Sequence, residues 1–281
     1  MKYRNMGKAG LKVSEIAVGS WMTDLASNQK VEMAAEIIRL AYDNGVNFFD
    51  CADAYSGGEA ERFLGRLLKD YRRSSIVVSS KVFFPTGGGA NEWGLSRKHI
   101  VENIDRSLKN MGMEYLDLYY CHRFDPSTPM EETLRTLSYL VDQGKILYYG
   151  VSEEWGGARL EEAQQIIREY HLHPLTSIQP QYHMMDRYIE HEIMGICEKY
   201  GIGITPFSLW RRGFSPENIK RGSRILKGPG QPIRRIGRST ICSRMKIWIK
   251  SKNLQKLPEN LEPICLCLPF PGFCEKELSA V

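Results

Sequence analysis

The stretch RKHIVENIDRSLKNMGMEYLDLYYCH, residues 97–122, decides the fold. Its first part, Arg97–Met111, repeats apolar residues every three to four positions, which is typical of an amphipathic helix. Its second part, Leu116–His122, is an apolar run with a polar end, as expected of a strand buried on both faces of a parallel sheet. A helix followed by such a strand is one repeat of an alternating α/β architecture.

The same repeat extends from this stretch in both directions along the chain. Similar apolar runs predict six more strands, at Glu15–Ser20, Asn47–Ala52, Ser75–Lys81, Leu147–Ser152, Ser177–Gln181 and Gly203–Ser208. Amphipathic segments predict five more helices, at Val31–Asn44, Glu59–Leu68, Met130–Gln143, Ala158–Tyr170 and Ile189–Tyr200. Lys2–Val13 reads as a hairpin. Seven strands, six helices and no G-x-G-x-x-G after the first strand favour an α/β fold of the (β/α)8 TIM-barrel type over a doubly wound sheet.

Composition excludes several classes of protein. The chain has 281 residues, of which 42% are hydrophobic and 25% charged, as is usual for globular proteins. It has no apolar run of membrane-spanning length and no apolar signal core, so we expect a cytoplasmic protein without membrane insertion. The seven cysteines are irregularly spaced, which predicts free thiols and no metal site.

Four residues with compatible chemistry lie at or just after three successive strand ends. Asp50 ends the second strand, Tyr55 lies in the following loop, Lys81 ends the third strand and His122 ends the fourth. Taken singly, Lys81 could be a solvated loop lysine, Tyr55 a rim aromatic and His122 a strand cap. Reacting groups of (β/α)8 barrels gather at the C-terminal ends of the strands. Together the four residues therefore predict a catalytic site.

The chemistry of this set suits reduction of a carbonyl group. A tyrosine with an ordinary pKa near 10 is a poor proton donor at neutral pH. We expect the cation of Lys81 to lower the pKa of Tyr55, with Asp50 holding Lys81 charged. His122 would donate a hydrogen bond to the carbonyl oxygen. Since no nucleophile is evident, a hydride-donating cofactor fits best.

Several motifs resemble the aldo/keto reductases, and most of all the branch of voltage-gated potassium channel β-subunits and their bacterial relatives. The motifs are MKYRNMGKAGLKVSEIAVGSW (1–21), NGVNFFDCADAY (44–55), GLSRKHI (94–100), DPSTPMEET (125–133), GVSEEW (150–155) and QPQYHMM (179–185). The resemblance implies a (β/α)8 barrel that reduces aldehydes or ketones with NADPH. It places Asp50, Tyr55, Lys81 and His122 on the family's catalytic tetrad, with Tyr55 as general acid.

The resemblance also implies a set of cofactor-binding residues. Ser152 and Gln179 match the positions that bind the nicotinamide carboxamide, and Phe207 matches the aromatic residue that stacks on the nicotinamide. Glu153 departs from the Asn or Arg usual after the serine. The complete expected set is Ser20, Trp21, Asp50, Ser152, Gln179, Phe207 and Ser208.

The periodic pattern and the resemblance both stop at Ser208. Residues 209–281 contain 15 Lys and Arg but only 5 Asp and Glu, and Pro269 and Pro271 exclude a regular helix or central strand near them. Back-translation of 208–219 in a shifted frame gives Pro-Leu-Ala-Glu-Gly-Phe-Leu-Thr-Gly-Lys-Tyr, a motif of the family. We therefore interpret 1–208 as an incomplete barrel and 209–281 as an irregular, out-of-frame tail that lacks the phosphate-binding segments.

These observations predict an NADPH-dependent reductase of a small aldehyde or ketone, with impaired activity in the chain as written. The alternative is a channel β-subunit-like regulator that binds the cofactor with little turnover. A nucleic-acid-binding role for the basic tail is weaker, because its arginines and Trp248 are loosely spaced. Self-association, the identity of the carbonyl compound and the preference for NADPH over NADH stay open.

Overall fold

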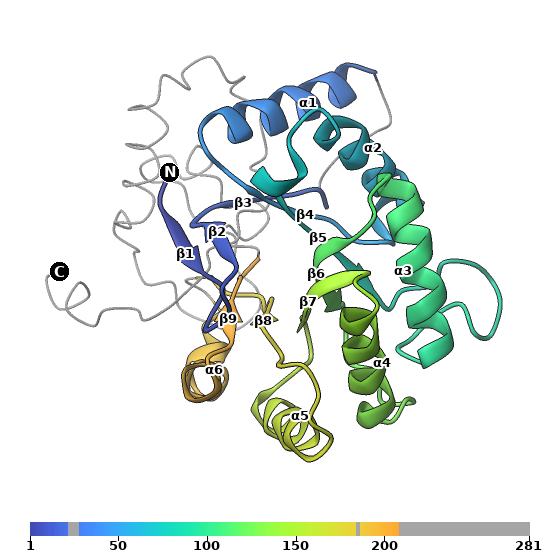
Figure 1. Ribbon diagram of the computed structural model, residues 1–281, viewed down its shortest axis with the longest axis vertical. Helices are drawn as coiled ribbons and strands as arrows, with labels where there is room; N and C mark the ends of the chain where they lie inside the picture. The colour runs from blue at the N-terminus through green and yellow to red at the C-terminus, as the bar shows by residue number, and fades with distance from the viewer. Residues whose placement is uncertain (22–27, 184–185, 208–281) are drawn as a thin grey trace, which may run out of the picture. The chain divides into compact units, whose positions relative to one another are not determined.

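The computed structural model describes residues 1–21, 28–183 and 186–207. Seven parallel strands form one sheet, and their spatial order is their order along the chain (Figure 1). The strands are β3 (Ala17–Gly19), β4 (Phe48–Asp50), β5 (Val77–Val82), β6 (Leu116–Cys121), β7 (Ile146–Val151), β8 (Ser177–Ile178) and β9 (Gly203–Ile204). Each lies within or overlaps its predicted run, so the predicted strand positions are confirmed.

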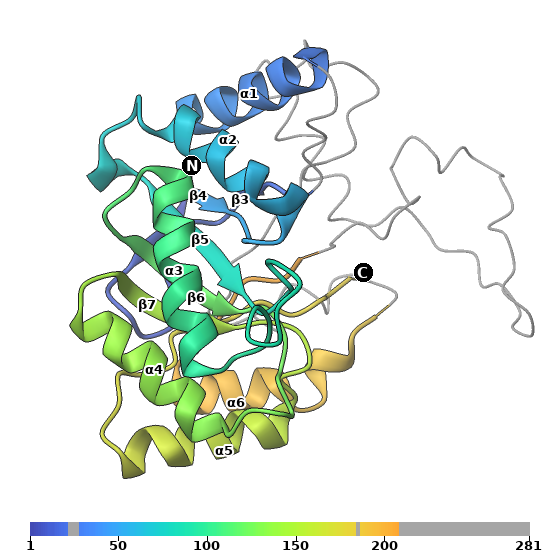
Figure 2. The same ribbon diagram turned by 90° about the vertical axis from the view of Figure 1, so that its right-hand side faces the viewer.

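Helices cover the outer side of this sheet, as Figures 1 and 2 show. They are α1 (Asn28–Asp43), α2 (Glu59–Leu68), α3 (Arg97–Met111), α4 (Met130–Asp142), α5 (Gly157–Glu169) and α6 (Ile193–Tyr200). Short 3-10 turns lie at η1 (Tyr55–Gly58), η2 (Arg73–Ser75) and η3 (Tyr188–Glu190). The prediction of one helix over Ile189–Tyr200 is wrong in detail, because the backbone of Glu192 (φ −139°, ψ −41°) separates η3 from α6.

Two helix ends follow the signals in the sequence. The side chain of Ser96 accepts a hydrogen bond from the backbone N–H of His99, so Ser96 is the N-cap of α3 as predicted. Gly144 has a φ of +71° just beyond α4, a conformation that L side chains rarely adopt. These caps fix where α3 begins and α4 ends, and so where β7 can start.

The hairpin of β1 (Tyr3–Asn5) and β2 (Lys12–Ser14) contacts the end of α6 and the start of β9. The backbone N–H of Lys8 donates to Gly201 O at 2.8 Å, and a Cβ at Gly7 would lie 2.1 Å from the same oxygen. Two residues of the hairpin, Met6 and Val13, are fully buried and form one hydrophobic cluster with side chains from the sheet. The sheet residues of this cluster are Ala17, Phe48, Val77, Leu118 and Tyr120.

Within the described residues the sheet has two edges, β3 and β9. This is the predicted incomplete (β/α)8 architecture: seven strands in barrel order. Ser208 and the whole of 209–281, to which the predicted tail belongs, lie outside the described residues. None of the described helices combines the length and the hydropathy needed to cross a membrane.

Candidate active site

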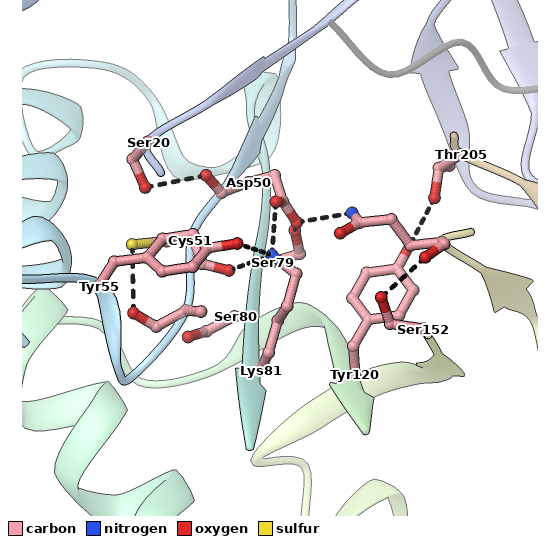
Figure 3. A network of polar contacts seen from close by, with 12 residues as sticks. Ser20, Asp50, Cys51, Tyr55, Ser79, Ser80, Lys81, Tyr120, Ser152 and Thr205 are labelled. Carbon is pink, nitrogen blue, oxygen red and sulfur yellow. Dashed lines mark hydrogen bonds and ion pairs between the residues drawn. The ribbon is translucent and has the colours of Figure 1, made fainter. Parts of the chain in front are cut away.

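The strand ends bring the predicted catalytic residues together. Asp50 is the last residue of β4, and Lys81 lies near the end of β5, which pairs with β4 in parallel. His122 directly follows β6, and its backbone N–H donates to Val82 O at 2.9 Å. Tyr55 opens η1, directly after the loop that leaves β4. Figure 3 shows Asp50, Tyr55 and Lys81 converging in one polar network.

The side chain of Lys81 is fully buried, and its ammonium has as many partners as it has protons. Nζ donates to Asp50 Oδ2 at 2.5 Å, to Cys51 O at 2.6 Å and to the Tyr55 hydroxyl at 3.4 Å. Burial would lower the pKa of Lys81, but the adjacent Asp50 carboxylate holds it above its ordinary value. Lys81 is therefore a fixed cation beside the phenol of Tyr55.

The carboxylate of Asp50 is held by three side chains. Besides Lys81, Ser79 Oγ donates to Oδ1 at 2.6 Å and Gln179 Nε2 donates to the same oxygen at 3.1 Å. The backbone N–H of Ser20 donates to Asp50 O at 2.9 Å. These contacts come from β5, from the segment after β8 and from the residue after β3. Asp50 therefore links three strands of the sheet at the candidate site.

Tyr55 keeps its proton in this environment. Burial raises the pKa of Tyr55 above its ordinary value, and the Lys81 ammonium opposes this rise without reversing it. The expected net lowering of the Tyr55 pKa is therefore wrong for the free protein, because removing the phenol from water disfavours phenolate more than one cation favours it. The phenol is thus available as a proton donor.

His122 is an uncharged ring against two aromatic side chains. Burial lowers the pKa of His122 well below its ordinary value, and the nearby Lys81 and Arg123 add to this effect. The ring meets Tyr55 edge to face at a centroid distance of 5.7 Å and Phe84 at 4.9 Å. Its Nδ1 is buried without a hydrogen-bond partner among the described residues. A neutral imidazole with an unused nitrogen suits a hydrogen bond to a ligand.

Three of the expected cofactor residues lie beside this network. Ser152 and Gln179 are buried next to each other, since Ser152 Oγ donates to Gln179 O at 2.7 Å. Gln179 reaches Asp50 through its amide nitrogen, which leaves its side-chain oxygen as an acceptor. Ser20 is also buried, and its Oγ donates to Asp50 O at 3.1 Å.

Two further expected cofactor residues, Trp21 and Phe207, are more exposed than these three. Trp21 is 41% exposed. Phe207 is half-buried, and its backbone N–H donates to Pro180 O at 3.0 Å, which places it beside the segment that carries Gln179. Ser208 lies outside the described residues.

Glu153 forms an ion pair that the sequence did not predict. Its carboxylate contacts the Arg123 guanidinium, which also lies 3.4 Å from Glu154 Oε1. Burial raises the pKa of Glu153, and Arg123 opposes this. Arg123 lies 5.9 Å over the ring of Phe84, so this ion pair borders His122.

Sequence reasoning also missed a second polar cluster behind Tyr55. Asp53 and Glu61 are carboxyl groups with 1% and 0% exposure. Asn103 Nδ2 donates to Asp53 Oδ2 at 2.8 Å, and Ser80 Oγ donates to Glu61 Oε1 at 2.6 Å. The available signal was two acidic residues near Tyr55 in the sequence, but Asp and Glu are rarely buried, whether in a loop, as Asp53 is, or on a helix, as Glu61 is. In the described part of the chain, no group of three or more His, Cys, Asp or Glu is arranged to hold a metal ion.

Comparison with known proteins gives a consistent result. The profile of the aldo/keto reductase family matches residues 15–263, so the match continues past Ser208, the expected end of the resemblance. The chain is 41% identical over 226 residues to a probable voltage-gated potassium channel subunit beta of Arabidopsis thaliana, covering 79% of this chain and 68% of that protein. A protein of the same description from Oryza sativa subsp. japonica is 40% identical with the same coverage. A putative subunit beta of Schizosaccharomyces pombe is 38% identical over 231 residues, covering 79% of this chain and 67% of that protein. The chain belongs to the aldo/keto reductase family of oxidoreductases.

Proposed function

We propose that the site reduces an aldehyde or ketone to an alcohol, with NADPH as the hydride donor and Tyr55 as the general acid. The observation that carries this proposal is the Lys81 ammonium held between Asp50 and Tyr55 in a fully buried position. A fixed cation next to a protonated phenol stabilises the negative charge that forms on the phenol oxygen when the proton leaves. The substrate class is a small carbonyl compound.

Each residue of the set then has one task. Tyr55 transfers its proton to the carbonyl oxygen as negative charge develops there. His122, neutral because burial depresses its pKa, donates a hydrogen bond to the same oxygen. Lys81 stabilises the resulting phenolate, and Asp50 keeps Lys81 charged and in place.

The described residues fit the nicotinamide end of the cofactor. Gln179 and Ser152 offer buried oxygen atoms beside Asp50, and a carboxamide needs such acceptors for its N–H groups. Phe207 brings an aromatic ring for the nicotinamide to the strand segment that pairs with the one carrying Gln179. When bound, the cofactor supplies the hydride. We place the protein in the cytoplasm, where NADPH is available to it, and leave self-association open.

Replacing Tyr55 with Phe tests the proposal in a version of the chain in which the shifted reading frame after Ser208 is restored. Oxidation of NADPH with a simple aldehyde should fall by about 10²-fold or more, because the substitution removes only the acidic hydroxyl. Binding of NADPH, followed by fluorescence, is the control and should not change. Undiminished turnover in Tyr55→Phe would show that this assignment is wrong.

A second candidate follows from the names of the relatives. Three similar proteins are described as channel β-subunits, so a regulatory protein that binds NADPH with little turnover is the rival. Some channel subunits have Asn at the position of His122. This chain has His122 beside the other three residues, as the ordinary enzymes of the family do, and this favours an enzyme. Co-purification of a membrane channel, together with absent turnover, would favour the rival.

A further inference from the structure

The segment that carries Tyr55 is fastened to the buried face of α3 at two points. Asn103 Nδ2 donates to Asp53 Oδ2 at 2.8 Å, on the N-terminal side of Tyr55. Asn110 Nδ2 donates to Glu61 Oε2 at 2.8 Å, on the C-terminal side. The two asparagines are seven residues apart, which is two helical turns, so they lie on the same face of α3. The position of Tyr55 therefore depends on α3 as well as on Lys81.

The backbone between these two anchors is held in an uncommon conformation. Ser56, Gly57 and Gly58 all have positive φ, of 49°, 63° and 89°. A serine in the left-handed region costs energy and persists only where the surroundings enforce it. On the N-terminal side, the backbone bond from Asp53 N to Lys81 O is long, at 3.4 Å. The side chain of Asp53 is thus an important support for this end of the loop.

The contact between the side chains of Asp53 and Asn103 lacks one hydrogen-bond donor. Asn103 Nδ2 donates to Asp53 and lies 3.2 Å from the Tyr119 hydroxyl. Within the described residues, Asp53 Oδ1 and Asn103 Oδ1 are both buried without a partner. An ionised carboxylate and an amide oxygen are both acceptors, so neither can satisfy the other. One proton on Asp53 would supply the missing donor.

The charges around Asp53 also favour its protonated form. Glu61 faces it from α2 and Tyr119 from β6, while Arg106 faces it from α3 as the opposing cation. The ammonium of Lys81 in β5 is turned to Asp50, Cys51 and Tyr55 instead. Burial and the negative charge of Glu61 raise the pKa of Asp53 to about 7, with Arg106 and Asn103 opposing.

We propose that Asp53 is a positioning residue whose protonated carboxyl group, paired with Asn103, holds Tyr55 over Lys81. Ionisation of Asp53 strengthens its one bond from Asn103 Nδ2, but it places a buried carboxylate near the negative charge of Glu61 and leaves Asn103 Oδ1 without a donor, so the anchor as a whole is weakened. The placement of Tyr55 becomes dependent on pH near neutrality. This inference rests on the proposed role of Tyr55 as proton donor.

The test follows Tyr55 by NMR in the full chain labelled with ¹³C at the tyrosine Cζ. The Tyr55 resonance is assigned by its loss in Tyr55→Phe, and its shift is measured from pH 5 to pH 9. We expect a shift with a midpoint near pH 7 in the native chain and none in Asp53→Asn, which should keep the low-pH position. Asp117→Asn is the matched control and should leave the shift intact, since Asp117 is also buried but binds Arg73 and the start of β5.

Turnover gives a second readout that separates this inference from the proposed function. In the frame-restored chain, NADPH-dependent reduction of an aldehyde should fall from pH 6 to pH 8, and in the same chain carrying Asp53→Asn it should stay near its low-pH level. Absent turnover of the frame-restored chain at every pH, with a moving Tyr55 resonance, would overturn the proposed function alone. A Tyr55 resonance that does not move with pH, or that moves equally in Asp53→Asn, would overturn the role of Asp53.

Discussion

At the scale of single residues, Lys81 and Asp50 form a buried ion pair with an N–O distance of 2.5 Å. Replacing Lys81 with Met leaves the Asp50 carboxylate buried without its cation. Breaking a buried pair in this way costs about 3–5 kcal/mol. We therefore expect the free energy of unfolding, measured by urea denaturation, to fall by that order in Lys81→Met.

The double variant Asp50→Asn/Lys81→Met is the control for this prediction. It removes both charges, so the penalty of the isolated carboxylate disappears, and it should be more stable than Lys81→Met alone. A double variant that is less stable than the single one would contradict the buried pair as described.

The carboxyl group of Asp53 makes the stability of the protein depend on pH. Burial and Glu61 raise its pKa to about 7, whereas an unfolded aspartate titrates at about 3.9. The folded state therefore binds this proton more tightly, so the contribution of Asp53 is most favourable below about pH 4 and is lost as pH rises through 7. As pH rises from 5 to 8, the free energy of unfolding of the native chain should therefore fall relative to that of Asp53→Asn, which does not ionise.

The size of this effect follows from the shift. The whole shift of about three pKa units corresponds to about 4 kcal/mol, of which about two units, or roughly 3 kcal/mol, fall between pH 5 and pH 8. Urea denaturation of both proteins at the two pH values measures it. An equal difference between native chain and variant at pH 5 and pH 8 would show that Asp53 does not titrate in the folded state.

Sequence alone brought the proposed catalytic residues together more readily than the residues that support them. Asp50, Lys81 and His122 could be found because strand ends in a parallel sheet meet at one edge. Asp53 and Glu61 could not, because their burial depends on which face α3 presents to them. The ion pair of Arg123 with Glu153 was also missed, although the two residues follow the neighbouring strands β6 and β7, because sequence does not show which side chains just beyond two strand ends will contact each other.

At the scale of elements, α2 and α3 pack closely at Gly65. A Cβ at this position would lie 2.2 Å from Met111 O, which is backbone and cannot move aside alone. We expect Gly65→Ala to lower the melting temperature, at a cost of about 1–3 kcal/mol, because the helices must separate. The same separation would loosen the anchors of the Tyr55 segment.

Gly195 in α6 is the matched control for this substitution. A Cβ there would meet no atom within 4 Å, so Gly195→Ala should stabilise the helix by about 0.5–1 kcal/mol. Thermal unfolding of both variants should give shifts of opposite sign. A Gly65→Ala variant as stable as the native chain would contradict the close packing of α2 and α3.

The elements were predictable where one physical pattern decided them. The ranges of α2 and α3 agree with their amphipathic repeats because both helices have one buried face, and α3 also has clear end signals in Ser96 and Gly112. The division between η3 and α6 was missed, because apolar spacing continues across Glu192 while the backbone does not. The strands β8 and β9 are shorter than their apolar runs, since backbone pairing, which sequence does not show, sets their ends.

At the scale of the whole molecule, the sequence predicts a change of reading frame at Ser208. This hypothesis is tested by determining the nucleotide sequence around the Ser208 codon, where we expect one base to be missing. The family profile extends to residue 263 of the chain as written, beyond Ser208. An intact reading frame in independently isolated genomic DNA would show that the chain is a true product as written.

The two sheet edges, β3 and β9, give this hypothesis a physical consequence. In a closed barrel no strand has a free edge. A tail rich in proline and arginine is poorly suited to pair with both strands and to cover the apolar surface between them. Since a domain is stable by only about 5–15 kcal/mol, exposing a few aliphatic side chains at about 1.5–3 kcal/mol each would remove much of that margin.

The most direct test of this account compares the chain as written with the frame-restored chain by titration with NADPH. The proposed catalytic residues lie within 1–207, and we propose that the segments that bind the cofactor phosphates lie beyond Ser208. We therefore expect the restored chain to bind NADPH and to show a sharp thermal transition, whereas the chain as written should bind far more weakly and unfold broadly. Equal NADPH affinity and an equally sharp transition in both chains would contradict this account.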